Sequence, residues 1–599
     1  MAYLQQTSQP TPTQIETFLG LNMNETGDTQ LKLGESGNMK NFRITKDYKL
    51  TKMNGYKQVY SVDSPIRSQW KGKLGDNEVH IFVAGGKIYN KGDEIGTLTD
   101  DITSIFEFNQ KLYFLNGHEY KVWDGKELKE VEGYIPLVRI TTTPDGQGTD
   151  FESINVLSDK RHQTFSPDGV AKDFMLLETN VTSIDKVLVN GVEMTTGITK
   201  DLTNGKVTFE TAPVQAVDNI DIYWTKGEVS KDLVTKNHYF QKYGLANDTR
   251  VFLYGNQDAK NRIRFSALAN GVPSVEYFPA TNFIDIGSNN TAVTDINRQY
   301  DRLIISKEDE TYYSNYETIT DSTGATIITF PAYPLNSSHG MVAYGQGQLL
   351  DNYVTTIDSS IIMWTSTVTK DERNAEIISQ RIQEWLNSKD LSKAITMDYQ
   401  ELKEYWLAIE NEIMIYNYGN STFYLLEIPH KVSSLLCDEG SIYLGTETGQ
   451  IMIFEDGETT YNGEIIKARW ESSFYDFEVD YRRKTMRTLF VSLQPHIKTS
   501  MRINYISDRD IGTDEKEIEN AVFSYEYWNY ENFSYNTNYH WLIGMRILAH
   551  YPNFSNTVMQ WIHKFPCHLF GIIGNNFKLV SFSHSRKEII HYDVGDKQV

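Results

Sequence analysis

Short runs of apolar residues separated by turns recur along most of the chain. The clearest example is Ser441–Gly457, in which the apolar runs Ile442–Leu444 and Ile451–Phe454 flank the turn sequence TETG. Two such runs joined by a glycine-containing turn are typical of a β-hairpin. Because a single hairpin cannot bury its apolar face in water, the pattern predicts that further hairpins pack against this one.

Similar strand–turn–strand segments occur elsewhere in the chain. They are Val79–Asn90, Lys111–Gly125, Arg250–Phe265, Leu303–Tyr313 and Glu404–Tyr418. Recurrence at spacings of roughly 30–50 residues is typical of a β-propeller, in which each blade is a four-stranded sheet. Roughly 310 residues have this pattern, and at about 45 residues per blade they predict six to seven blades. A large β-sandwich whose hairpins resemble one another is the alternative.

The segment Ile135–Gly227 has a different pattern. Pro-Asp-Gly and Asn-Gly turns separate its alternating strands, and Ile220–Trp224 reads as an edge strand near its end. This pattern predicts a small β-sandwich inserted into a propeller loop. Two further, longer blades are the alternative.

The chain is therefore expected to be mainly β. The predicted parts are an N-terminal arm with anchoring strands (1–60), a first propeller part (61–134), the inserted β-sandwich (135–227), a second propeller part (228–460) and a C-terminal β-rich region (461–599). After residue 541 histidine becomes frequent and acidic residues become rare, and no fold is predicted there.

One segment has the periodicity of a helix. In Asp371–Leu386, the residues Ile378, Ile382 and Trp385 fall on one face. Packing on the rim of the propeller is one interpretation. The other is a subunit contact with Trp385 as its anchor.

The charge limits the classes of partner. The 599 residues include 57 Lys and Arg against 79 Asp and Glu, which gives a formal net charge of −22. This balance argues against a protein that binds nucleic acid along its whole surface, although DNA could still pass an acidic wall that repels it. The 2 cysteines predict no disulfide framework. The N-terminus does not resemble a secretory signal, and no apolar run approaches the length of a membrane span.

A basic cluster stands out in this acidic sequence. It consists of Arg482, Arg483, Lys484 and Arg487. If these side chains lined one groove, they could contact DNA. The alternative is a solvent-exposed strand edge that Lys and Arg protect against aggregation.

Known catalytic and metal-binding motifs do not occur in the sequence. It has neither a G-x-x-x-x-G-K-[ST] phosphate loop nor a G-x-S-x-G nucleophile elbow. His563, Cys567 and His568 do not match known zinc spacings, and Asp145 with Asp150 lie in a segment too short for an EF-hand. The expectation is a protein without catalytic residues, metal or cofactor. A glycosidase pair could still be present among the many carboxylates.

The N-terminal region resembles a phage family. A Gly-Glu-Ser opening, an Asn-Met-x-Asn segment and a Lys-Leu-x-Lys…Gly-Tyr close are similar to the start of packaged-DNA stabilisation proteins, also called tail tubular proteins B or tail nozzle proteins. The matching residues are Gly34, Glu35, Ser36, Asn38, Met39, Asn41, Lys49, Leu50, Lys52, Gly55 and Tyr56. The similarity in pattern covers about residues 15–538.

The resemblance implies a structural virion protein of the head–tail junction or tail nozzle, assembled in the host cytoplasm. It implies a hexameric ring below the portal and adaptor proteins, contacts with tail fibres, spikes or a needle, and double-stranded DNA passing through the lumen without sequence specificity. Six copies would carry 6 × −22 = −132 formal charges, which would let DNA slide without binding. The implied function is closure of the portal channel, retention of packaged DNA and ejection. Candidate assembly residues are Glu35, Asn38, Met39, Asn41, Arg43 and Trp385.

A receptor-binding or glycan-binding tail propeller, which could also cleave a glycan, is the alternative function. Its aromatic residues, including Trp123, Trp364 and Trp406, would then line sugar sites. A peripheral scaffolding propeller of cellular origin is a third hypothesis.

Overall fold

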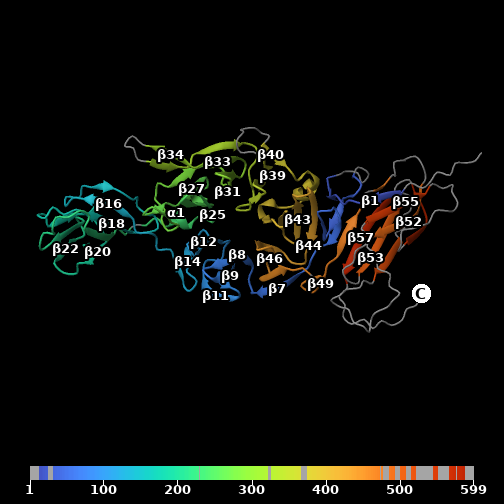
Figure 1. The fold of residues 1–599 in the computed structure, drawn as a ribbon, viewed down its shortest axis with the longest axis horizontal. Coiled ribbons are helices and arrows are strands. Elements are labelled where there is room, and N and C mark those ends of the chain that lie inside the picture. Colours follow the sequence, from blue (N-terminus) through green and yellow to red (C-terminus); the bar gives the residue numbers. More distant parts are fainter. Residues whose placement is uncertain are drawn as a thin grey trace, which may run out of the picture. The chain divides into compact units, whose positions relative to one another are not determined.

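Strands make up most of the regular structure in the computed structural model of the chain (Figure 1). The structure describes residues 12–24, 31–227, 229–320, 326–365, 374–456 and 458–472. After residue 473 it describes the backbone of seven strands, β51 (Phe474–Tyr475) to β57 (Phe577–Arg586). The chain divides into two compact units. Unit 1 comprises Met1–Ile66, Ser359–Ile362 and Ile377–Val599, and unit 2 comprises Arg67–Asp358 and Met363–Glu376.

The first two sheets have four strands each, and strands that follow one another in the chain lie side by side. Their orders are β11–β10–β9–β8 and β12–β13–β14–β15. The strands are β8 (Ile66–Leu74), β9 (Asn77–Ala84), β10 (Lys87–Asn90), β11 (Asp93–Thr97), β12 (Ser104–Phe108), β13 (Lys111–Leu115), β14 (Tyr120–Trp123) and β15 (Leu128–Glu130). Apolar residues that alternate along these strands pack into one core, which includes Ile81, Leu112 and Trp123.

Three sheets of the same kind follow the insertion. Their orders are β25–β26–β27–β30, β31–β32–β33–β36 and β37–β38–β39–β40. The strands are β25 (Tyr239–Leu245), β26 (Asp248–Tyr254), β27 (Arg262–Phe265), β30 (Phe283–Asp285), β31 (Val293–Gln299), β32 (Arg302–Lys307), β33 (Thr311–Asn315), β36 (Ala332–Asn336), β37 (Gln348–Leu350), β38 (Tyr353–Ile357), β39 (Ile361–Trp364) and β40 (Ala375–Ile377). Two hairpins extend from them, β28 (Leu268–Ala269) with β29 (Val272–Pro273), and β34 (Glu317–Thr320) with β35 (Thr326–Thr329).

Unit 1 contains two larger sheets, of ten and six strands, and both include strands from the N-terminal segment. The first includes β41 (Ile395–Tyr399), β42 (Glu404–Ile409), β43 (Glu412–Asn417) and β44 (Thr422–Glu427), extended by β4 (Asn38–Lys40). The second includes β45 (Val432–Asp438), β46 (Ser441–Thr446) and β47 (Gln450–Phe454), extended by β7 (Tyr56–Ser61). Strand β7 pairs antiparallel with β47, from Ser61 opposite Gln450 to Tyr56 opposite Phe454. The hairpin predicted in Ser441–Gly457 is therefore confirmed as β46 and β47, and its sheet continues through the N-terminal strand β7.

Four-stranded antiparallel sheets that follow one another along the chain are the blades of β-propellers. The predicted fold class, mainly β with propeller-type sheets, is confirmed. The number of blades in a closed ring stays a prediction.

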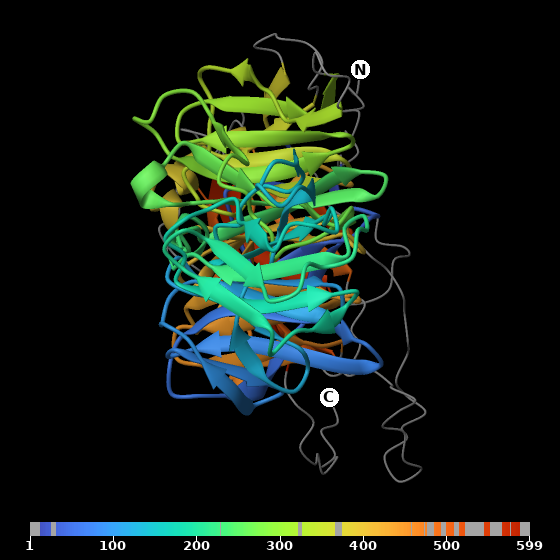
Figure 2. The same ribbon diagram turned by 90° about the vertical axis from the view of Figure 1, so that its left-hand side faces the viewer.

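The insertion has its own sheets and core. A six-stranded sheet has the order β17–β16–β18–β24–β20–β21, and a three-stranded sheet has the order β19–β23–β22. The strands are β16 (Leu137–Thr142), β17 (Thr149–Asp150), β18 (Lys160–Phe165), β19 (Asp173–Met175), β20 (Ser183–Val189), β21 (Val192–Glu193), β22 (Ile198–Asp201), β23 (Lys206–Phe209) and β24 (Ile220–Thr225). Phe165, Phe174 and Trp224 pack together between them. In Figure 2 these strands, coloured cyan to green, face the viewer.

The helix predicted for Asp371–Leu386 is wrong for most of its length. Residues 371–373 lie outside the described part, and Ala375–Ile377 forms strand β40. A 3₁₀ turn and a short helix, α2 (Gln383–Asn387), follow. The amide of Ile378 donates to the carbonyl of Ile361 at 3.0 Å, and the hydroxyl of Ser379 accepts the amide of Ile361 at 2.9 Å. Sheet bonding therefore overrides the helical periodicity.

Strands beyond residue 473 join unit 1. Strand β1 (Pro12–Ile15) pairs with β55 (Gly544–His550), in a sheet that also holds β52 (Lys484–Ser492) and β56 (Pro566–Gly574). Strand β57 pairs with β50 (Ala468–Glu471). In the described part of the chain, no helix is both long enough and apolar enough to span a bilayer.

Candidate functional site

The residues that carry the phage resemblance lie mostly inside unit 1. Glu35 is 2% exposed, Met39 1% and Asn41 4%. Asn38 is half-buried and lies opposite Glu471 in the pairing of β4 with β50. These predicted assembly residues therefore hold the N-terminal segment, here called the latch (residues 31–56), against the sheets of unit 1.

Asn41 makes hydrogen bonds from the latch to several parts of unit 1. Its side-chain amide donates to the carbonyl of Lys467 at 2.9 Å, and its Oδ1 accepts the amide of Glu427 at 2.9 Å and the hydroxyl of Tyr461 at 3.3 Å. Its own amide donates to the carbonyl of Leu425 at 2.8 Å. Its φ of 58° lies in the left-handed region, which asparagine tolerates better than most residues. One side chain thus joins three separate segments of unit 1.

Glu35 and its neighbour Ser36 fix the start of the latch. Oε2 of Glu35 accepts the side-chain amide of Asn22 and the backbone amide of Lys32, both at 3.1 Å. The guanidinium of Arg381 lies 3.7 Å from Oε1. The hydroxyl of Ser36 accepts the amide of Glu471 at 3.3 Å.

Arg43 forms an ion pair with a fully buried carboxylate. Its Nε lies 2.8 Å from Oε1 of Glu404, and its NH2 donates to Oε2 at 3.0 Å. The Glu404 side chain is 0% exposed. It also accepts the indole N–H of Trp406 at 3.0 Å and the hydroxyl of Tyr424. Burial alone would lower the pKa of Arg43, but the charges and hydrogen bonds of Glu404 and Tyr424 together outweigh it, so the pKa is raised.

Trp385 is also an internal residue of unit 1. It is 5% exposed, and its indole N–H donates to Oε2 of Glu412 at 2.7 Å. Lys389 pairs with the same carboxylate at 2.9 Å. The side chain therefore stabilises α2 against β43, and within this chain it is not an exposed anchor.

The basic cluster lies in the C-terminal region. Lys484 and Arg487 belong to strand β52, while Arg482 and Arg483 lie outside the described residues. DNA contact by this cluster stays a prediction.

The tryptophans proposed for sugar sites are buried, so that expectation is wrong. Trp123 is 4% exposed, and Trp364 and Trp406 are 0% exposed. The indole of Trp364 donates to the hydroxyl of Thr356 at 3.0 Å. Aromatic residues on alternating strand positions face the core here, and a sugar platform requires an exposed ring face.

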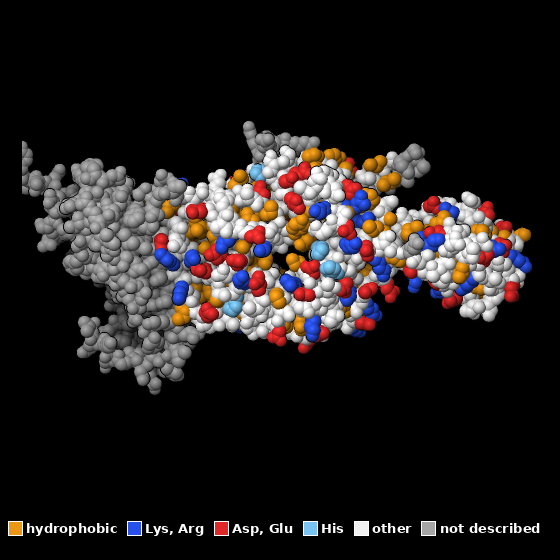
Figure 3. Space-filling view, turned by 180° about the vertical axis from the view of Figure 1, so that it is seen from behind, with side chains coloured by type: hydrophobic (Ala, Val, Ile, Leu, Met, Phe, Trp, Pro, Cys, Tyr) orange, Lys and Arg blue, Asp and Glu red, His pale blue; other side chains and the backbone are white. Residues whose placement is uncertain are grey.

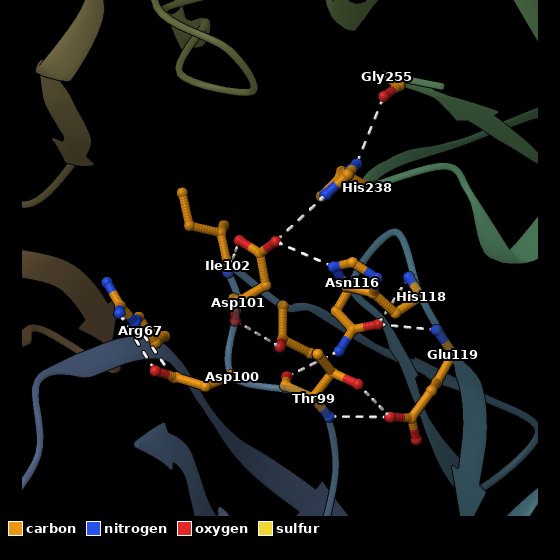
Figure 4. Close-up of polar contacts among 11 residues, drawn as sticks. Arg67, Thr99, Asp100, Asp101, Ile102, Asn116, His118, Glu119, His238 and Gly255 are labelled. Atoms are coloured by element: carbon orange, nitrogen blue, oxygen red, sulfur yellow. Dashed lines mark hydrogen bonds and ion pairs between the residues drawn. The ribbon is translucent and has the colours of Figure 1, made fainter. Parts of the chain in front are cut away.

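A polar cluster that the sequence did not reveal lies in unit 2 (Figure 4). Asp101 precedes β12, His118 lies in the turn between β13 and β14, and His238 precedes β25. Oδ2 of Asp101 lies 3.3 Å from Nε2 of His118 and 3.7 Å from Nε2 of His238. Figure 4 shows the two imidazoles converging on this one carboxylate, and their ring centroids are 6.4 Å apart.

Hydrogen bonds around the Asn116 turn hold the cluster in place. Oδ1 of Asn116 accepts the amides of His118 at 3.1 Å and Glu119 at 2.8 Å, and its amide donates to the carbonyl of Thr99 at 3.0 Å. Glu119 accepts the amide of Thr99 at 2.8 Å and its hydroxyl at 2.6 Å. Partial burial alone would raise the pKa of Glu119, but hydrogen bonds from Lys121 and Thr99 outweigh it and lower the pKa.

The cluster of Asp101, His118 and His238 is a solvent-exposed site at which a carboxylate can pair with a histidine. The side chains of Asp101 and His118 are 40% and 50% exposed. In its protonated form, either histidine can form an ion pair with Asp101. Such a pair links the segment before β12 to the β13–β14 turn or to the segment before β25. Among the residues that the structure describes, no three His, Cys, Asp or Glu side chains are placed to hold a metal ion. The residues next to His118 in the sequence, Asn116-Gly117, predict only a turn. No feature of that sequence indicates that His238 lies beside the turn.

We expect Gly117→Ala to disrupt this cluster. Gly117 has φ +80°, and a Cβ there would overlap the ring of His238. The left-handed φ costs about 1–2 kcal/mol and the overlap about 1–3 kcal/mol more in free energy of unfolding. Gly191→Ala is the matched control, because Gly191 has φ +78° and its Cβ would meet nothing within 4 Å. Urea unfolding and the NMR shifts of the His238 ring measure the difference. If both variants lost the same free energy of unfolding and the His238 ring shifts did not change, the contact between residue 117 and His238 would be contradicted.

Charged side chains show no large area of one sign on the face drawn in Figure 3. Lys, Arg, Asp and Glu are interspersed over the described part of that face. Such a surface does not hold DNA by a broad electrostatic attraction.

Comparison with known proteins identifies no family. No family model matches the chain, and no curated protein matches it. Among solved structures, the computationally designed Ika8 protein is 9% identical, with a TM-score of 0.31 over 66% of this chain and 99% of that chain. BamB from Moraxella catarrhalis is 10% identical, with a TM-score of 0.31 over the same shares. At these scores neither likeness bears on what this chain does.

Proposed function

We propose that this chain is a structural, non-catalytic protein of a phage virion, located at the head–tail junction or tail nozzle. In this proposal six copies, the number that the resemblance implies, form a ring that adjoins the portal and adaptor proteins. The ring retains packaged DNA and conducts it during ejection. Its action is geometric, so it requires no cofactor.

The main support for this proposal is the structure of the latch. The residues that match the phage pattern include several with specific structural tasks. Asn41 joins three segments, Glu35 closes the start of the latch, and a Cβ on Gly55 would overlap the backbone of Thr460. A pattern in which several members have such tasks is more specific than a chance match of letters. That observation supports, by resemblance, membership in the family whose proteins begin with this pattern.

The acidic charge fits the same role. A formal charge of −22 per copy around a channel would repel the phosphates of a duplex, which carries about one charge per 1.7 Å. DNA could then pass without being held by sequence or by charge. Tight binding to nucleic acid requires a basic patch or stripe on one face of a protein.

Incorporation into particles tests the proposal. We expect a chain that lacks Met1–Gly55 to be missing from purified virions and to leave heads that lose their DNA. A labelled full chain should be found at the head–tail junction by electron microscopy. Lys87→Ala is the control, because it removes only an exposed ion pair with Glu94 in unit 2. Normal, full particles from the deletion, or a full-length label away from the junction, would refute the proposal.

A further inference from the structure

Four exposed valines lie in or beside neighbouring turns of the insertion: Val170, Val214 and Val217 on loops, and Val192 at the start of β21. Val170 is 79% exposed, Val192 67%, Val214 80% and Val217 77%. Together they are called the valine patch. The insertion already has a complete core around Phe165, Phe174 and Trp224, so these valines are not needed to fold it.

The loops that carry the valine patch are bonded to one another. The amide of Ala216 donates to the carbonyl of Pro167 at 3.3 Å, and the amide of Asn190 donates to the carbonyl of Asn219 at 2.7 Å. The amide of Asp218 donates to the hydroxyl of Ser166 at 3.0 Å. The loops 166–171 and 212–219 and the turn 190–191 before β21 are therefore neighbours, although they are far apart in sequence.

Short side-chain bonds also fix the shape of two of these loops. Oδ1 of Asp168 accepts the amides of Val170 at 2.8 Å and Ala171 at 2.7 Å. Oδ1 of Asp218 accepts the amide of Thr141 at 2.7 Å and the hydroxyl of Thr164 at 2.8 Å. A partner that binds here meets a surface whose backbone is already ordered, which reduces the entropy lost on association.

Neighbouring exposed valines can form the centre of a protein interface. Single exposed apolar residues are ordinary on protein surfaces, but neighbouring ones that form a patch of a few hundred Å² often mark a contact site. A standard interface buries about 800 Å² on each partner and has a polar rim around an apolar centre. The valines would supply that centre.

The charge around the patch indicates which partner fits. Asp168, Glu193 and Glu210 are exposed and belong to the same loops or their flanks, against one exposed Lys172. Another copy of this acidic chain, an anionic bilayer or DNA would be repelled. A protein face with Lys and Arg around an apolar centre would be attracted.

We propose that the valine patch is the docking surface for a different protein, whose contact face is apolar at its centre and lined with Lys and Arg. This interaction does not depend on the virion role proposed above. It gives the insertion a function of its own, which is to present a preformed apolar surface to a basic partner.

Selection from a randomised peptide display library tests this proposal on the full-length chain. We expect the enriched peptides to carry apolar residues flanked by Lys or Arg. Their binding should weaken at least about tenfold in the triple variant Val170→Ser, Val214→Ser, Val217→Ser. It should weaken several-fold, with a smaller dependence on salt, when Asp168→Asn and Glu210→Gln are combined.

A matched control separates the patch from apolar exposure in general. Val272→Ser changes a valine that is 60% exposed on β29, outside the insertion, and should leave peptide binding unchanged. Thermal unfolding should show that every variant is folded, because the substituted valines do not belong to the core. Three results would overturn the proposal: no enriched peptides, peptides that bind the triple variant equally well, and self-association that the triple variant abolishes.

Discussion

Arg43→Ala is expected to lower the free energy of unfolding of unit 1 by about 3–5 kcal/mol, because it leaves the buried charge of Glu404 without its partner. The Glu404 side chain is 0% exposed and would retain only the hydrogen bonds from Trp406 and Tyr424. Urea unfolding followed by tryptophan fluorescence measures the loss, since Trp406 lies beside the substituted pair. The transition of unit 2 should not move.

Two controls identify the cause of that loss. Arg262 pairs with Asp285 at 2.7 Å in a partly exposed ion pair, so Arg262→Ala should cost no more than about 1 kcal/mol. Replacing both buried partners, Arg43→Met with Glu404→Leu, should recover much of the stability, because no unpaired charge remains. If Arg43→Ala cost no more than Arg262→Ala, the buried pair would not hold the latch.

The stability of unit 2 is expected to fall as the pH rises from about 4 to about 7. Burial raises the pKa of Asp295 to about 7, against hydrogen bonds from Gly347, Tyr254 and Asn297 that lower it. Between the pKa of the unfolded state and that of the folded state, the folded protein binds more protons, so raising the pH favours unfolding. About three pKa units correspond to about 4 kcal/mol at most. The loss should be complete above pH 7.

Asp295→Asn isolates this effect. The difference between wild type and variant cancels the contribution of every other titrating group. The variant should lack the part of the pH dependence that Asp295 causes. Asp285 behaves in the opposite way, because its hydrogen bond from Arg262 lowers its pKa and its contribution is lost at acidic pH. Parallel pH profiles for wild type and variant would show that Asp295 does not titrate as stated.

Much of the fold was visible in the sequence because hairpins are local. The apolar runs and the glycine turn of Ser441–Gly457 suffice to predict β46 and β47, since each strand lies a few residues from its neighbour. The changed turn pattern of Ile135–Gly227 likewise coincides with a segment that has its own sheets and core. The same local reasoning gave the wrong element for Ala375–Ile377. Its apolar periodicity predicts a helix, but its backbone forms strand β40 of a sheet.

The candidate sites were less visible, because they bring together residues that are remote in sequence. Asp101 and His238 meet through the loops before β12 and β25, and neither local sequence resembles a known motif. The valine patch arises in the same way, from three loops whose valines look ordinary one at a time. The sugar-site prediction was wrong because the presence of an aromatic residue does not indicate whether its face of the strand is buried. The three residues concerned, Trp123, Trp364 and Trp406, are all buried.

The sequence by itself determined the mainly β class and the local hairpins, because alternation and turn residues act over a few positions of the chain. Only the tertiary structure decided which distant strands join each sheet and which charges are buried. Strand β7 joins the sheet of β47, and Arg43 reaches Glu404 across 361 positions. Packing and the free-energy cost of burying an unpaired charge determine such pairings. The residues adjacent in sequence to each partner do not indicate either factor.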